Sequence, residues 1–115
     1  MSKEIEDLWD LVDETLLTVM RRDGKNAMEQ LAKLMEECGE LAQAMLCVHG
    51  AKTSVHRGLT KSHIKEELAD ILLCVKTLAL THGISTKELE TFSGVKLYKW
   101  HEKLDEQERK AWEKV

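Results

Sequence analysis

The chain has 115 residues, no proline, 43% hydrophobic and 33% charged residues, and a formal net charge of −4. This length is typical of one domain, and the apolar and charged contents exclude a disordered chain. The mild acidity disfavours nucleic-acid and membrane partners, and no apolar run approaches the roughly 20 residues that a membrane span requires.

The first half of the chain predicts two helices. Apolar residues recur at intervals of three and four, as on one helix face, over about residues 3–22. Gly24 follows and can adopt the positive φ that ends a helix. Asn26 is an expected N-cap, and Glu29 three residues later completes a capping box, so a second helix is predicted over about residues 27–48.

A polar, basic loop is expected next, from about residue 49 to 61. Ser62 is the predicted cap of a third helix over about residues 62–82, which Gly83 ends.

Ser85 and Glu88 then form an S-x-x-E capping box, which predicts a fourth helix over about residues 86–113. No segment alternates with a period of two, so no strand is predicted. The predicted fold is an all-α four-helix bundle that forms a single domain over residues 1–115.

Acidic residues interrupt the apolar faces of the second and third helices. Glu37 borders the apolar stripe of its helix, whereas Glu67 lies within the next one, four residues before Ile71. Each is followed three residues later by another carboxylate, Glu40 and Asp70 respectively. Like charges one turn apart repel, and carboxylates near a core lose hydration. The pattern therefore predicts a site for a hard divalent cation, chiefly Mg²⁺ with Mn²⁺ as a possible substitute.

The acidic and metal-ligating residue types also allow other interpretations. The acids would be ordinary solvated surface groups if each were taken alone. A di-iron carboxylate site uses Glu-x-x-His, and no glutamate here has a histidine three residues later. The five histidines lack zinc spacing, and the three cysteines, which include no C-x-x-C pair, are expected in the core. Unpaired cysteines and an N-terminus without a signal-peptide core predict a reducing, cytoplasmic location.

The acidic segments match a known signature. The runs Glu36-Glu37-Cys38-Gly39-Glu40-Leu41-Ala42 and Glu66-Glu67-Leu68-Ala69-Asp70-Ile71-Leu72 together resemble the E-E-x-x-E … E-x-x-D pattern of the MazG-like all-α nucleoside triphosphate pyrophosphohydrolases. The resemblance covers roughly residues 27–103. It implies hydrolysis of (deoxy)nucleoside triphosphates to the monophosphate and pyrophosphate, in nucleotide-pool house-cleaning, by a homodimer or homotetramer.

The resemblance also implies roles for individual residues. The positions that hold Mg²⁺ in the family match Glu37, Glu40, Glu67 and Asp70, and Glu36 matches an additional acid. The general base that takes the proton of the attacking water is expected to be Glu36 or Glu40.

The fourth helix carries a second, weaker match to the family. Lys96-x-x-Lys99-Trp100-x-x-Lys103 resembles its K-x-x-K-F-x-x-R segment, with lysine at the usual arginine position. The three lysines share one helix face and are expected to bind phosphate, unless they form a solvated basic surface. Trp9 is expected to stack on a nucleobase, or else to pack in the core.

Two alternatives to this function remain open at the level of the sequence. One is a phosphoribosyl-ATP pyrophosphohydrolase, although Cys74 stands where that branch more typically has histidine. The other is a non-catalytic helical oligomerisation module whose acidic residues only keep it in solution.

Overall fold

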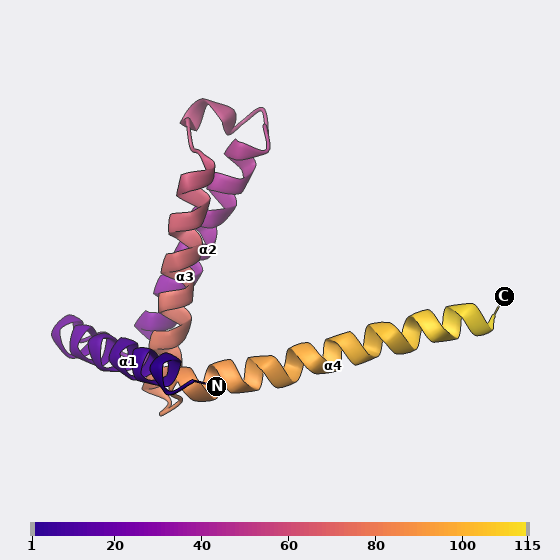
Figure 1. Cartoon of the computed structure of the whole chain (residues 1–115). Helices are drawn as coiled ribbons and strands as arrows, with labels where there is room; N and C mark the ends of the chain where they lie inside the picture. The colour runs from indigo at the N-terminus through magenta and orange to yellow at the C-terminus, as the bar shows by residue number, and fades with distance from the viewer. Residues whose placement is uncertain (1, 115) are drawn as a thin grey trace.

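The computed structural model describes residues 2–114, and these form four α-helices and one short 3₁₀ helix (Figure 1). The elements are α1 (Lys3–Asp23), α2 (Ala27–Val48), η1 (Val55–Arg57), α3 (Lys61–Thr81) and α4 (Thr86–Glu113). No strand occurs between residues 2 and 114. The predicted all-α class with four helices is therefore confirmed, and each helix begins and ends within one residue of its predicted range.

Local capping chemistry explains where the helices begin and end. Asn26 Oδ1 accepts a hydrogen bond from the Glu29 N–H at 2.8 Å, and the Glu29 side chain accepts the Asn26 N–H at 3.2 Å, which is the predicted capping box. Gly24 ends α1 with φ of +68°, as expected. Ser85 caps α4 by accepting the Glu88 N–H at 3.2 Å.

The predicted cap of α3 is wrong by two residues. Thr60, not Ser62, is the N-cap, and α3 begins at Lys61. The reason is His63 at the third helical position, whose Nδ1 accepts the Thr60 N–H at 3.0 Å. The imidazole thus plays the part that a glutamate plays in an ordinary capping box.

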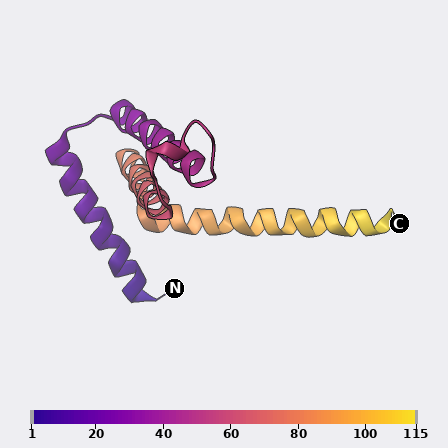
Figure 2. The same cartoon turned by 90° about the horizontal axis from the view of Figure 1, so that it is seen from above.

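Helices α2 and α3 form an antiparallel hairpin, and α1 and α4 lie at its base (Figure 1). Viewed from above, the start of α4 lies near the middle of α1, and the rest of α4 projects away from the other helices (Figure 2). The chain bends by 110° between α3 and α4. No single helix within residues 2–114 is long and apolar enough to cross a membrane; only the bent α3–α4 pair, taken together, has the required length and composition.

This arrangement is more open than the predicted four-helix bundle. The radius of gyration is 18.8 Å, against about 13 Å for a compact chain of this length. The cause is the bend before α4. This helix packs on α1 and α3 near its beginning and is otherwise exposed. The four helices of a single chain therefore do not pack together into a closed bundle.

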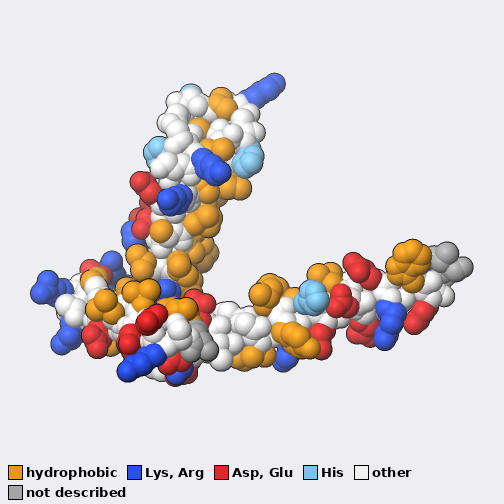
Figure 3. All heavy atoms as spheres, in the orientation of Figure 1, with side chains coloured by type: hydrophobic (Ala, Val, Ile, Leu, Met, Phe, Trp, Pro, Cys, Tyr) orange, Lys and Arg blue, Asp and Glu red, His pale blue; other side chains and the backbone are white. Residues whose placement is uncertain are grey.

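Most large apolar side chains remain accessible to solvent. Among the described residues, Ala44 and Cys47 are the buried hydrophobic ones, whereas Cys74 is half-buried and Cys38 is exposed. The predicted core location thus holds for Cys47 and is wrong for Cys38, which points outward from α2. Figure 3 shows hydrophobic side chains along the side of the α2–α3 hairpin that faces α4, and again along α4 itself.

A buried carboxylate joins the first helix to the last. Asp13 of α1 accepts the backbone N–H of Thr86 at 3.0 Å and also the Thr86 hydroxyl, and both residues are buried. Asp13 therefore satisfies a free N–H at the start of α4 and places a negative charge at its positive end. This contact fixes the point from which α4 projects.

A cysteine organises the loop at the tip of the hairpin. The Cys47 sulfur accepts the Leu59 N–H at 3.2 Å, and it lies 3.8 Å from the Val55 carbonyl oxygen as a donor. These contacts hold the loop and η1 against the end of α2.

Candidate metal centre

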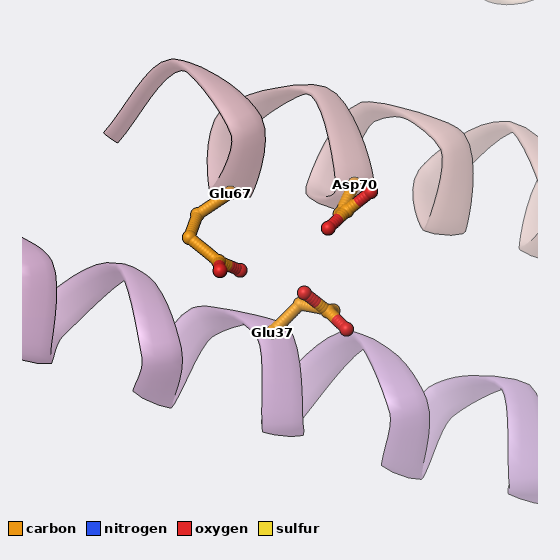
Figure 4. A group of neighbouring side chains, drawn as sticks. All are labelled: Glu37, Glu67 and Asp70. Atoms are coloured by element: carbon orange, nitrogen blue, oxygen red, sulfur yellow. The ribbon is translucent and has the colours of Figure 1, made fainter. Parts of the chain in front are cut away.

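Three carboxylates from the two hairpin helices converge near the middle of the hairpin. Glu37 comes from α2, whereas Glu67 and Asp70 come from successive turns of α3, and their side chains point toward one another (Figure 4). One oxygen of each lies within 4.8 Å of an oxygen of the other two. The sequence spacing brings Glu67 and Asp70 onto one face of α3, and the antiparallel pairing sets that face against Glu37.

Two oxygens of this cluster are buried without a partner. Among residues 2–114, Glu37 Oε2 and Glu67 Oε2 are the buried side-chain oxygens that accept no hydrogen bond. Glu37 is only 5% exposed, so water cannot readily replace the missing contact. Unsatisfied carboxylate oxygens are costly in this position, which indicates that a cation or a proton belongs between them.

The second oxygen of Glu37 is held by a lysine. Lys33 lies one turn earlier on α2, and its Nζ is 2.9 Å from Glu37 Oε1. The ammonium group also lies 4.0 Å from Glu36. This hydrogen bond is the main cause that lowers the pKa of Glu37 below its ordinary value of 4.5, and Glu37 in turn raises the pKa of Lys33.

Glu67 shows the opposite behaviour. The pKa of Glu67 is raised from 4.5 to about 7. The largest cause is a hydrogen bond with the Glu37 carboxylate, and burial and the charge of Glu40 add to it. Two neighbouring carboxyls with pKa values pushed apart share a single proton more readily than they hold two charges. Without a metal, the cluster is thus stabilised by Lys33 and, below about pH 7, by a proton on Glu67.

The remaining predicted acids lie at the edge of this cluster. Glu40 is exposed and lies outside the group of three, but its negative charge contributes to the raised pKa of Glu67. Glu36 has a side chain that is 63% exposed and lies beside Lys33, on the outer side of α2. The structure therefore brings together three of the four predicted metal ligands and places the fourth close by.

The predicted substrate-binding residues are not brought to the cluster within one chain. Lys96, Lys99 and Lys103 are exposed on the projecting part of α4. Only the beginning of α4 packs on other helices, and these are α1 and α3 rather than α2. Lys96 lies over the Phe92 ring at 5.8 Å, a cation–π contact within its own helix. Trp9 is half-buried on α1, which likewise contacts α3 and α4 rather than α2.

Two residues of structural consequence were not singled out from the sequence. Asp13 lies four residues after Trp9 and three before Leu16, so it interrupts an apolar stripe just as Glu67 does. Lys33 precedes Glu37 by four residues, the spacing of an ion pair on a helix. Both patterns are present in the sequence. Ion pairs four residues apart are common on helix surfaces, however, so the spacing alone does not distinguish Lys33 from other lysines.

The donor set suits a hard divalent cation. All three converging side chains offer carboxylate oxygens, which Mg²⁺ and Mn²⁺ accept, while nitrogen and sulfur ligands are absent from this group. The two orphaned oxygens would gain the partner that they lack. The residues present therefore fit a metal of this class.

Comparisons with known proteins agree with this chemistry. The family model described as the MazG nucleotide pyrophosphohydrolase domain matches residues 25–104, which include the whole α2–α3 hairpin and most of α4. Comparison with curated proteins and with solved structures gave no significant match.

Proposed function

Because the chain belongs to the MazG nucleotide pyrophosphohydrolase domain family, we propose that it hydrolyses nucleoside or deoxynucleoside triphosphates to the monophosphate and pyrophosphate. The observation that carries this proposal is the Glu37, Glu67 and Asp70 cluster with its two unpartnered buried oxygens, which lies within the matched region. Clearance of unwanted nucleotides in the cytoplasm is the proposed setting.

The proposed cofactor is Mg²⁺, held by Glu37, Glu67 and Asp70 with Glu40 as a fourth ligand. When bound, it would neutralise the repulsion between carboxylates and triphosphate and polarise the phosphoanhydride. The chain's own contribution is to orient these oxygens from two rigid helices and to supply a base. Glu40 is the better placed of the two proposed bases, because its charge reaches the cluster whereas Glu36 lies beside Lys33 at the outer surface.

We also propose that two or more copies of the chain assemble into the active protein. The accessible surface is 8981 Å², against about 6,400 Å² for a compact monomer of 13.2 kDa. A stable interface buries about 800 Å² on each partner, so the excess is ample for a dimer or tetramer. Exposed apolar residues on α4, among them Leu97, Trp100 and Leu104, supply the side chains to bury.

Assembly would also resolve the separation of basic and acidic residues. Lys96, Lys99 and Lys103 lie on α4, away from the acids of their own hairpin. We propose that these lysines bind the phosphates of a nucleotide held at the cluster of another copy, and that Trp9 stacks on its base. The opposite charges of the two surfaces favour this contact.

The direct test is to incubate the purified protein with ribo- and deoxynucleoside triphosphates and Mg²⁺, and to measure pyrophosphate and monophosphate. Glu67→Gln should remove activity while the helical circular dichroism is retained. If no triphosphate is cleaved above an EDTA control, the proposed activity is wrong. Turnover of phosphoribosyl-ATP alone would instead identify the enzyme of that branch.

A metal titration separates an enzyme from an oligomerisation module. Millimolar Mg²⁺ should raise the thermal unfolding midpoint, and Glu67→Gln should abolish most of that rise. A midpoint that Mg²⁺ does not change would favour the module.

A further inference from the structure

Lys33 lies beside the candidate metal centre but has no role in the proposed reaction. Its ammonium group is 2.9 Å from Glu37 Oε1, and the other oxygen of the same carboxylate is buried without a partner beside Glu67. Its side chain is 39% exposed, so the ammonium group can leave for solvent, whereas Glu37 is 95% buried and cannot. The same carboxylate is therefore shared between a mobile internal cation and the candidate metal centre.

We propose that Lys33 is the internal counter-ion of Glu37 in the metal-free protein and that it opposes metal binding. This inference rests on the proposed metal centre. Its physical basis is that a buried carboxylate without a neutralising partner is unstable, so the chain needs a cation there when no metal is bound. Once a divalent cation occupies the cluster, the same ammonium group repels it across a few ångströms.

Lys33 has the reach and the surroundings for this role. The carboxylates of Glu36, Glu37 and Glu40 on its own helix all act on its charge, and Glu36, at 4.0 Å, offers it an alternative partner near the surface. From α3, Glu67 and Asp70 face the same Glu37 carboxylate. Lys33 can therefore move from Glu37 toward Glu36 without becoming unpaired.

The consequence is a metal centre that binds a free cation less tightly than its carboxylates alone would. A cation that arrives with a polyphosphate carries extra negative charge to the site, which offsets the repulsion by Lys33. Lys33 thus favours loading of the metal together with its nucleotide over loading of the metal alone.

The test is Mn²⁺ binding to the stripped full-length protein, without nucleotide, measured by calorimetry or by the electron paramagnetic resonance signal of free Mn²⁺. Lys33→Met should tighten binding by several-fold, on the order of three- to tenfold for one solvent-facing charge. Lys33→Arg keeps the charge and should bind Mn²⁺ like the wild type. Lys110→Met is the matched control, because it removes an ion pair with Glu106, 3.2 Å away on α4, and should leave Mn²⁺ affinity unchanged.

Thermal unfolding gives a second readout that an ordinary ion pair would not produce. In EDTA, Lys33→Met should unfold at a lower temperature than the wild type, and saturating Mn²⁺ should remove the difference. A difference that persists with Mn²⁺, or Mn²⁺ affinity that is unchanged or weaker in Lys33→Met, would overturn the inference.

The two proposals fail in distinguishable ways. If neither the wild type nor Lys33→Met binds Mn²⁺, the metal centre itself is wrong and the inference is lost with it. If the wild type binds Mn²⁺ and Lys33→Met binds no more tightly, only the role of Lys33 is wrong. For a Lys33→Met protein that does not fold, Lys33→Gln provides the same comparison.

Discussion

Individual carboxylates in this protein differ according to what lies one turn away. Lys33, on the same helix, lowers the pKa of Glu37, whereas the neighbouring Glu37 raises the pKa of Glu67 to about 7. The same residue type thus supplies one fixed charge and one protonation equilibrium within a single cluster.

This difference predicts how stability depends on pH without metal. The pKa of Glu67 is about 7 in the folded protein and 4.5 when unperturbed. The folded state therefore binds more protons between these values, and the resulting stabilisation, complete below pH 4.5, is lost as the pH rises through 7. In EDTA, the unfolding midpoint of the wild type relative to Glu67→Gln should fall between pH 5 and pH 8. A constant difference across this range would contradict the assignment.

The choice of general base can be tested with two neighbouring variants. At Mg²⁺ concentrations that saturate each variant, so that loss of a metal ligand is separated from loss of the base, Glu40→Gln should reduce kcat by about 10² or more, whereas Glu36→Gln should change it only a few-fold. Both variants remove one negative charge from an exposed position on the same helix, so each controls for the other. A large loss in Glu36→Gln alone would reverse the assignment.

At the scale of elements, the tertiary contact between α1 and α4 includes a buried polar pair. Asp13 and Thr86 are both buried, and the Asp13 carboxylate accepts two hydrogen bonds from the first residue of α4. Most helix caps are local, whereas this one comes from a residue far away in sequence. The direction in which α4 leaves the molecule therefore depends on α1.

Removal of this contact should be costly. Asp13→Ala leaves the buried N–H and hydroxyl of Thr86 without an acceptor, which should lower the free energy of unfolding by about 2 kcal/mol. Asp10→Ala, at an exposed position on the same helix, should change it by less than about 0.5 kcal/mol. Urea unfolding of both variants at one protein concentration measures the difference, and equal effects would contradict a structural role for Asp13.

The elements were largely predictable from sequence because their signals are local. The Asn26 and Glu29 capping box, the terminal Gly24 and the absence of proline determine where helices run, and neighbours along the chain settle each of these. Ser62 was a wrong cap because a histidine can accept the bond that a glutamate usually accepts. The acidic cluster was predictable because Glu67 stands within an apolar stripe.

The arrangement in space was less predictable. Helical periodicity shows that Leu97 and Leu104 belong to an apolar face, but not whether this face packs within the same chain or on another. For the same reason, Lys99 could be placed on a helix face but not relative to Glu37. Contacts between elements depend on the bend at residues 82–85, and sequence spacing indicates that a helix ends there without giving the angle.

At the scale of the whole molecule, the exposed apolar face of α4 predicts self-association. Light scattering after gel filtration should give at least twice the 13.2 kDa mass of one chain. Leu104→Glu should weaken the assembly, because Leu104 is 59% exposed in the single chain and would be buried on association. A monomeric wild type would contradict the proposed assembly.

If the assembly forms as proposed, the projection of α4 predicts that two inactive variants can complement each other. Each nucleotide would then bind to the carboxylates of one copy and the lysines of another, so neither copy alone would contain a complete site. Two defective variants, Glu67→Gln and Lys99→Glu, should complement each other when unfolded and refolded together. In a mixed assembly, the carboxylates of the Lys99→Glu copy and the lysines of the Glu67→Gln copy would form an intact site. Part of the activity lost in each separate preparation would therefore return.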